Sequence, residues 1–125
     1  MDSNIVSIEQ TRRTRDGGRD AVGQYRVGSA AGGIELEFAL EAKRYNLNNS
    51  VGVKETSRLI SRIKHRQFGI IVTTSFVGDQ AYKEIIEDQQ PIVVISGKDI
   101  VDILISAGIN SIAILDEWIK ANFQI

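Results

Sequence analysis

A regular alternation of side chains between residues 34 and 42 constrains the fold of this chain more than any other feature. The apolar positions are interleaved with acidic or small ones: Ile34, Leu36, Phe38 and Leu40 alternate with Glu35, Glu37, Ala39 and Glu41. Successive side chains of a β-strand point to opposite faces, so a period of two is typical of a strand whose faces differ. The sequence therefore predicts a strand here, with one apolar face and one largely acidic face.

The segments before this strand predict further antiparallel strands. Residues 5–8 are apolar and favour a strand or the end of a longer element, and residues 21–27 alternate loosely, as a strand does. Residues 11–18 are polar and contain glycine, which indicates a loop. The small residues at 28–33 indicate a hairpin connection into the strand at 34–42.

After residue 51 the apolar period changes to three and four, which predicts an amphipathic helix. Its apolar side carries Val53, Thr56, Leu59, Ile60 and Ile63, and its other side carries Lys54, Arg58 and Arg62. The β-branched runs at residues 68–73 and 92–95 predict buried strands. Helices are predicted at residues 78–88, 97–107 and 110–123, the last with Ile114, Leu115, Trp118 and Ile119 facing inward. This order predicts an α/β fold with a mixed sheet and helices packed on it.

Composition limits the class of protein. The 125 residues suit one domain, and the chain has no cysteine, which is consistent with the cytoplasm. No apolar run approaches the roughly 20 residues that span a bilayer, and the first ten residues lack the pattern of a signal peptide. Residues 1–66 carry 12 Lys and Arg against 8 Asp and Glu, whereas residues 67–125 carry 3 against 8. The basic half either forms a face that attracts phosphate or is ordinary solvated charge.

Two carboxylates and an ammonium group are predicted to meet on neighbouring strands. Glu41 and Lys43 are two residues apart and so point to the same face, and Asp20 follows a pair of glycines just before the preceding strand. With Asp20 opposite them, the group has the minimum equipment to hold a hard divalent cation beside a phosphodiester. The structural alternative is a turn aspartate that bonds its own backbone, with Glu41 on a solvated charged face.

Four motifs occur in an order that resembles one family of nucleases. They are Asp-Gly-Gly-Arg-Asp at 16–20, Glu-Ala-Lys-Arg-Tyr at 41–45, Val-Gly-Val at 51–53 and Ile-Ile-Val-Thr-Thr-Ser at 70–75. In this order they resemble the Mrr-like restriction endonucleases, a branch of the PD-(D/E)XK nuclease superfamily. The resemblance implies a restriction-endonuclease-like α/β/α sandwich with a mixed central sheet, formed by a single nuclease domain over residues 1–125. Such domains usually begin with a helix, so the chain is expected to be a fragment of a longer restriction enzyme, a short version, or one whose C-terminal helix takes that place.

The resemblance also implies the roles of the site residues. Asp20 and Glu41, assisted by the backbone carbonyl of Ala42, bind Mg²⁺, for which Mn²⁺ substitutes. Lys43 orients or helps to deprotonate the attacking water and stabilises charge on the phosphate. Arginine suits contacts with DNA phosphates because its guanidinium group binds phosphate oxygens bidentately. The arginines expected to bind DNA, with plain surface charge as the alternative, are Arg12, Arg13, Arg15, Arg19, Arg44, Arg58 and Arg62.

The predicted function is metal-dependent cleavage of double-stranded DNA by the catalytic domain of a restriction-type enzyme. Recognition of sequence or base modification is expected in a separate domain or subunit. Cleavage of both strands takes two active sites, which favours a dimer or a higher homo-oligomer. The alternatives are a Holliday-junction resolvase or DNA-repair nuclease of the same fold, a catalytically inactive DNA-binding module, and an interaction module with a chance motif.

Overall fold

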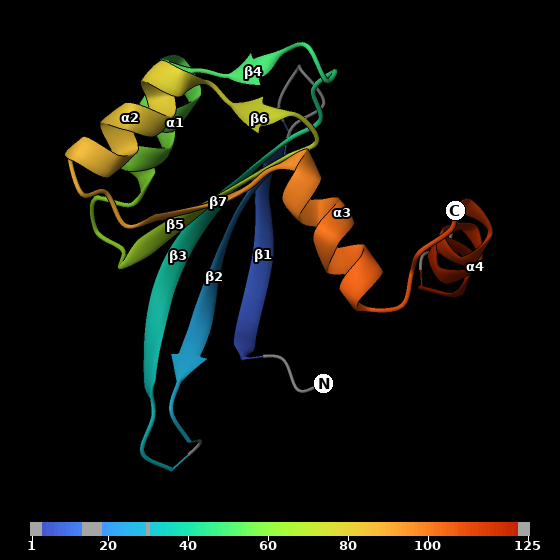
Figure 1. Ribbon diagram of the computed structural model, residues 1–125. Helices are drawn as coiled ribbons and strands as arrows, with labels where there is room; N and C mark the ends of the chain where they lie inside the picture. The colour runs from blue at the N-terminus through green and yellow to red at the C-terminus, as the bar shows by residue number, and fades with distance from the viewer. Residues whose placement is uncertain (1–3, 14–18, 30, 123–125) are drawn as a thin grey trace.

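The computed structural model describes residues 4–13, 19–29 and 31–122. Its main sheet has five strands in the spatial order β1-β2-β3-β5-β7 (Figure 1). The strands are β1 (Ile5–Arg13), β2 (Arg19–Val27), β3 (Ile34–Lys43), β5 (Phe68–Thr73) and β7 (Ile92–Ile95). The first three pair antiparallel, and β3, β5 and β7 pair parallel. The sheet is therefore mixed, as the sequence predicted.

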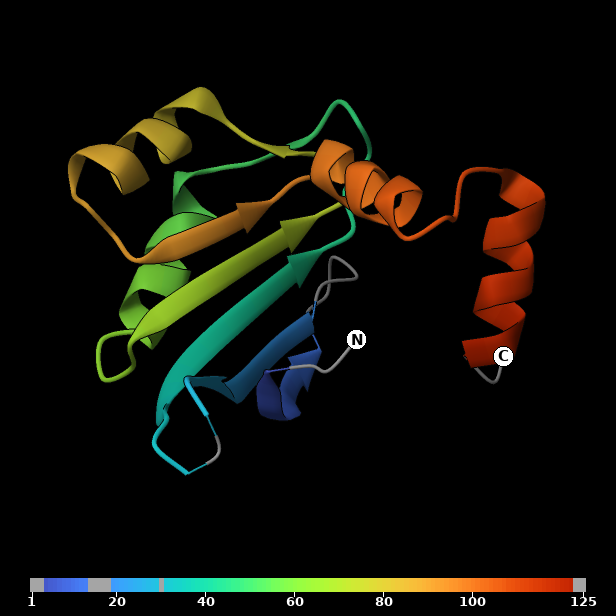
Figure 2. The same cartoon turned by 60° about the horizontal axis from the view of Figure 1, so that its bottom comes forward.

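The helices are α1 (Val53–Arg62), α2 (Asp79–Glu87), α3 (Gly97–Ser106) and α4 (Ile112–Asn122). α1 and α2 lie side by side at one end of the molecule, α3 continues from the end of β7, and α4 lies at the opposite end (Figures 1 and 2). A second, two-stranded sheet that the sequence analysis did not predict pairs β4 (Ser50–Val51) with β6 (Phe76–Val77). None of the helices in the described residues has the length and apolarity to span a membrane.

The hydrophobic core lies between the sheet and helices α1 and α2. Its buried residues are Ala39, Val51, Leu59, Ile63, Ile71 and Ile85. On β3, Glu41 and Lys43 share the face of Ala39 and are only 1% and 2% exposed. The helices thus cover this end of the acidic face, and a solvated charged face is found only farther along the strand, where Glu35 and Glu37 are exposed.

Two predictions of local structure are wrong. Residues 11–13, expected in a loop, continue β1, because this strand pairs with β2 as far as Arg13 opposite Arg19. The rest of the predicted loop, residues 14–18, lies outside the described residues. In α4, Ile114 and Trp118 were expected to face inward, but each is 40% exposed. An apolar period predicts an amphipathic helix, but it does not identify the element that covers the apolar side.

Candidate active site

Asp20 and Glu41 face each other across β2 and β3. The strand register pairs the two residues directly, which places their side chains on the same face of the sheet. Both are buried, with 4% of Asp20 and 1% of Glu41 exposed. Lys43 lies two residues farther along β3 on this face and is also buried. The structure therefore brings together the two carboxylates and the ammonium group that the sequence predicted to meet.

Helix α1 places two arginines against these carboxylates. Arg58 Nε donates a hydrogen bond of 3.3 Å to Glu41 Oε1. Arg62 Nη1 lies 3.8 Å from Asp20 Oδ1 and 3.7 Å from Glu41 Oε1. The same guanidinium donates hydrogen bonds to the carbonyl oxygens of Leu40, at 3.0 Å, and Ala21, at 2.9 Å. A single side chain thus joins α1 to both strands beside the carboxylate pair.

Each carboxylate keeps one buried oxygen without a hydrogen bond. Within the part of the chain that the structure describes, these atoms are Asp20 Oδ1 and Glu41 Oε2. Buried polar atoms are normally hydrogen-bonded, so two orphaned acceptors on facing residues call for a further partner. Carboxylate oxygens are the ligands that Mg²⁺ and similar hard cations prefer. No larger cluster of His, Cys, Asp and Glu occurs among the described residues, so a cation here would rely on this pair and on main-chain or water oxygens.

Burial dominates the electrostatics of Glu41. Desolvation raises the pKa of its carboxyl group above the ordinary 4.5. The positive charge of Arg58 opposes this rise, the negative charge of Asp20 adds to it, and Lys43 and Arg62 oppose it to a smaller extent. The site therefore favours the protonated form of Glu41 more than water does.

The remaining predicted arginines have different positions. Arg44 follows β3 directly and is exposed. The backbone of Arg12 lies beside the acid pair, because Arg12 pairs with Asp20 across β1 and β2. The role of four arginines stays a prediction, since Arg15 lies outside the described residues and nothing is described of the side chains of Arg12, Arg13 and Arg19.

Two polar groups near the site have partners within the protein. Glu55 accepts hydrogen bonds from the backbone nitrogen of Gly52, at 2.9 Å, and from the hydroxyl of Tyr45, at 3.0 Å. These bonds satisfy a donor at the N-terminus of α1, the helix that carries both arginines. Thr73, which pairs with Lys43 in the register of β3 and β5, shares a 3.1 Å hydrogen bond with Ser75. Both groups support the elements around the site.

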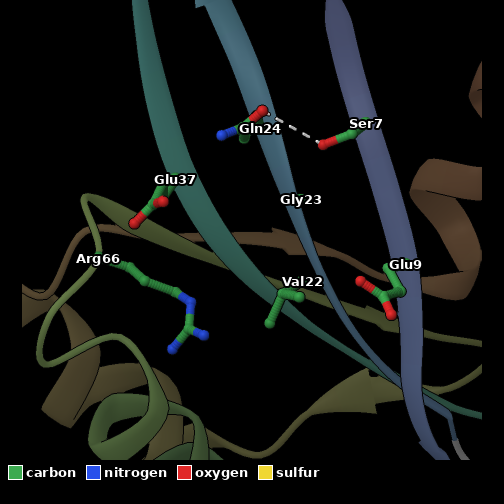
Figure 3. Close-up of a pocket in the computed structure, with 7 residues that line it drawn as sticks. All are labelled: Ser7, Glu9, Val22, Gly23, Gln24, Glu37 and Arg66. Atoms are coloured by element: carbon green, nitrogen blue, oxygen red, sulfur yellow. Dashed lines mark hydrogen bonds between the residues drawn. The ribbon is translucent and has the colours of Figure 1, made fainter.

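A polar pocket of about 290 Å³ continues the same face of the sheet away from the carboxylates (Figure 3). Its lining residues are Ser7, Glu9, Val22, Gly23, Gln24, Glu37 and Arg66. Figure 3 shows Arg66 reaching from the segment after α1 toward the strands, and its Nη1 donates a 2.7 Å hydrogen bond to the carbonyl of Arg62. The sequence analysis missed Arg66, and helical spacing from Arg58 and Arg62 could not have placed it, because α1 ends at Arg62.

This chain is similar to restriction endonucleases in sequence and in structure. Residues 2–104 match the model of the Mrr catalytic domain, described as a restriction endonuclease. The DNA modification-dependent restriction endonuclease AspBHI is 52% identical with a TM-score of 0.82, over 91% of this chain and 30% of that one. The MspJI restriction endonuclease, solved in complex with a 27-mer oligonucleotide, is 31% identical with a TM-score of 0.57, over 62% of this chain and 17% of that one. No curated protein matches.

Proposed function

We propose that this chain, which belongs to the Mrr-like restriction endonuclease family, is a metal-dependent DNA endonuclease domain. The family has the fold and belongs to the superfamily that the sequence motifs indicated. It hydrolyses phosphodiester bonds by attack of an activated water. One observation supports this function most directly: two buried carboxylates face each other, each with an oxygen that lacks a hydrogen bond, and a buried lysine lies beside them. No apolar core needs this arrangement, whereas metal-assisted phosphodiester hydrolysis uses carboxylate ligands of this kind.

The carboxylates of Asp20 and Glu41, assisted by the backbone carbonyl of Ala42, would hold Mg²⁺, for which Mn²⁺ would substitute. When bound, the metal supplies Lewis-acid stabilisation of the charge that develops on the phosphate. The buried oxygens Asp20 Oδ1 and Glu41 Oε2 fit this role because each lacks a hydrogen-bond partner and can still donate an electron pair to a cation.

Basic side chains of the protein act on the attacking water and on the reacting phosphate. Lys43 orients or helps to deprotonate the attacking water with its Nζ group and offsets negative charge on the phosphate oxygens, as a compact cation can. Arg58, whose side chain is 36% exposed, can contact a phosphate while it bonds Glu41. Arg62 donates hydrogen bonds to two main-chain carbonyls, so we propose that it organises the active site and does not contact DNA.

The substrate is double-stranded DNA, bound through its backbone by exposed and strand-end arginines. Arg44 follows β3 directly and is exposed, and Arg12, Arg13, Arg15 and Arg19 precede Asp20 in the sequence. The AspBHI relative is described as dependent on DNA modification, and the MspJI relative is described with an oligonucleotide. We extend both properties to the full enzyme, in which a separate domain or subunit recognises the DNA. We also propose that the catalytic domain forms a dimer or a higher homo-oligomer, and that the enzyme is located in the cytoplasm.

Nicking of supercoiled plasmid tests the function. The wild-type protein is incubated at high concentration with Mg²⁺, Mn²⁺ or EDTA beside Lys43→Ala, and Lys54→Ala serves as the matched exposed lysine. The wild type and Lys54→Ala should nick the plasmid only with metal. Lys43→Ala should lose about 10²–10³-fold in rate, the usual effect of removing one charge-stabilising group.

The other outcomes identify the alternatives. Equal activity of the wild type and Lys43→Ala would indicate a contaminating nuclease or a different site. Inactivity on plasmid together with cleavage of a four-way junction would favour a Holliday-junction resolvase. Metal binding without cleavage of any DNA would favour an inactive DNA-binding module.

A further inference from the structure

Arg62 occupies a place at which its charge acts on both carboxylates at once. Its Nη1 lies within 4 Å of Asp20 Oδ1 and of Glu41 Oε1. Arg58 adds a second guanidinium, bonded to Glu41 Oε1 alone. With the ammonium group of Lys43, three basic side chains therefore surround the two carboxylates in a buried site.

Two main-chain hydrogen bonds hold the positive charge of Arg62 in position. Arg62 donates to the carbonyls of Ala21 and Leu40, the residues that directly follow Asp20 and directly precede Glu41. Its side chain is 21% exposed, whereas that of Arg58 is 36% exposed. A guanidinium with two such anchors does not move away when another cation approaches. A divalent ion that binds the carboxylates must therefore do so against a charge that stays in place.

We infer that Arg62, aided by Arg58, is a resident cation of the site: it balances the carboxylates in the metal-free protein, lowers their affinity for a divalent ion and restricts them to one ion. The inference rests on the metal site of the proposed function. One oxygen of Glu41 is taken by Arg58, and the oxygens without hydrogen bonds are one on each carboxylate, which suits a single ion between them. Arg62 is therefore a positioning residue that also sets metal affinity.

A purely structural role for Arg62 predicts the opposite change in metal affinity when this residue is removed. If Arg62 only held α1 to the two strands, its removal would loosen the carboxylates and weaken metal binding. If its charge is what matters, removal strengthens binding, and a lysine that keeps the charge without the planar two-carbonyl contact restores the wild-type affinity. The two interpretations therefore differ in whether removal of Arg62 weakens or strengthens binding of the divalent ion.

The test is Mn²⁺ binding to the full chain, measured by electron paramagnetic resonance of the free ion, with thermal melts in EDTA. The wild type should bind one Mn²⁺. Arg62→Gln should bind it at least tenfold more tightly and should melt at a lower temperature without metal, whereas Arg62→Lys should keep an affinity close to wild type. Arg66→Gln is the matched control, because Arg66 bonds the Arg62 carbonyl; its affinity should change less than twofold.

Each result decides between the readings. Unchanged or weaker binding by Arg62→Gln, with a wild type that binds, would overturn the inference and leave the proposed function standing. Absence of Mn²⁺ binding in the wild type and in every variant would overturn the metal site, and with it the proposed function. If Arg62→Gln does not fold, Arg58→Gln decides: about threefold tighter binding supports the inference, and weaker binding overturns it.

Discussion

A buried carboxylate oxygen without a hydrogen bond destabilises the fold, and Glu41 allows this effect to be measured. Its Oε2 is orphaned, and it faces the negative charge of Asp20. In Glu41→Gln the amide removes one negative charge and can donate a hydrogen bond to Asp20. We expect this variant to be more stable than wild type by about 1–2 kcal/mol at pH 8 in EDTA, while it loses metal-dependent cleavage. Circular-dichroism melts measure the difference.

The gain in Glu41→Gln should depend on pH in a definite direction. The pKa of Glu41 is raised in the folded protein, chiefly by desolvation, so folding is favoured when this group is protonated. Wild-type stability should therefore fall, relative to the variant, as the pH rises from the unfolded pKa of about 4.5 through the folded pKa. Glu37→Gln, an exposed position on the same strand, should stay within about 0.5 kcal/mol of wild type throughout. A variant less stable than wild type at pH 8 would show that Glu41 forms a net stabilising ion pair.

At the same scale, the sequence predicted the acid pair and the lysine but not their partners on α1. Residues two apart on a strand share a face, so Glu41 and Lys43 follow from spacing alone. The period of α1 placed Arg58 and Arg62 away from its apolar side, which suggested exposure toward DNA. In the structure that side adjoins the carboxylates, because the packing angle of a helix on a sheet is a tertiary property that helical spacing does not contain.

Among the helices and strands, the start of α3 leaves very little room for an added side-chain atom. A Cβ added to Gly97 would lie 2.3 Å from the carbonyl oxygen of Thr74, a backbone atom in the segment that follows β5. Gly97 also donates a 2.9 Å hydrogen bond to the carbonyl of Ser75. Gly97→Ala should therefore displace α3 from the strand ends and cost about 1–3 kcal/mol of stability.

Chemical denaturation measures the effect of Gly97→Ala. Gly32→Ala is its control, because a Cβ there would meet only the Ser29 hydroxyl oxygen at an ordinary 3.7 Å, and it should change stability by less than about 0.5 kcal/mol. Equal stability of the two variants would mean that α3 adjusts freely and does not fix the ends of β5 and β7.

Elements with strong apolar patterns were predictable, and those made by pairing were not. The alternation at 34–42 and the β-branched run at 68–73 correspond to β3 and β5 almost residue for residue. The polar end of β1 is a strand only because β2 pairs with it, and β4 and β6 have two residues each, too few for any period. Strand pairing supplies hydrogen bonds that a single segment does not reveal.

For the whole molecule, the most unusual property is the apolar surface of α3 and α4. Four of its side chains are more than half exposed: Val101 at 52%, Ile103 at 58%, Ile105 at 54% and Ile112 at 86%. Between the helices lies an apolar hollow of about 240 Å³, lined by Ile105, Ile112 and neighbouring residues. Monomeric soluble proteins rarely expose apolar side chains in such a group, which usually marks an interface.

We expect a second copy of the chain to cover this surface, because cleavage of both DNA strands needs two active sites and the carboxylates lie on other elements, β2 and β3. Light scattering after size exclusion should show a dimer for the wild type and a monomer for Ile105→Asp combined with Ile112→Asp. The double variant should still nick plasmid but should lose linearisation, because each monomer carries one complete site. Leu47→Asp, which changes a 79% exposed leucine in the segment between β3 and β4, should remain dimeric and linearise DNA. A wild-type monomer that still linearises plasmid would show that the two cuts are made in separate encounters, and that the apolar surface serves another partner.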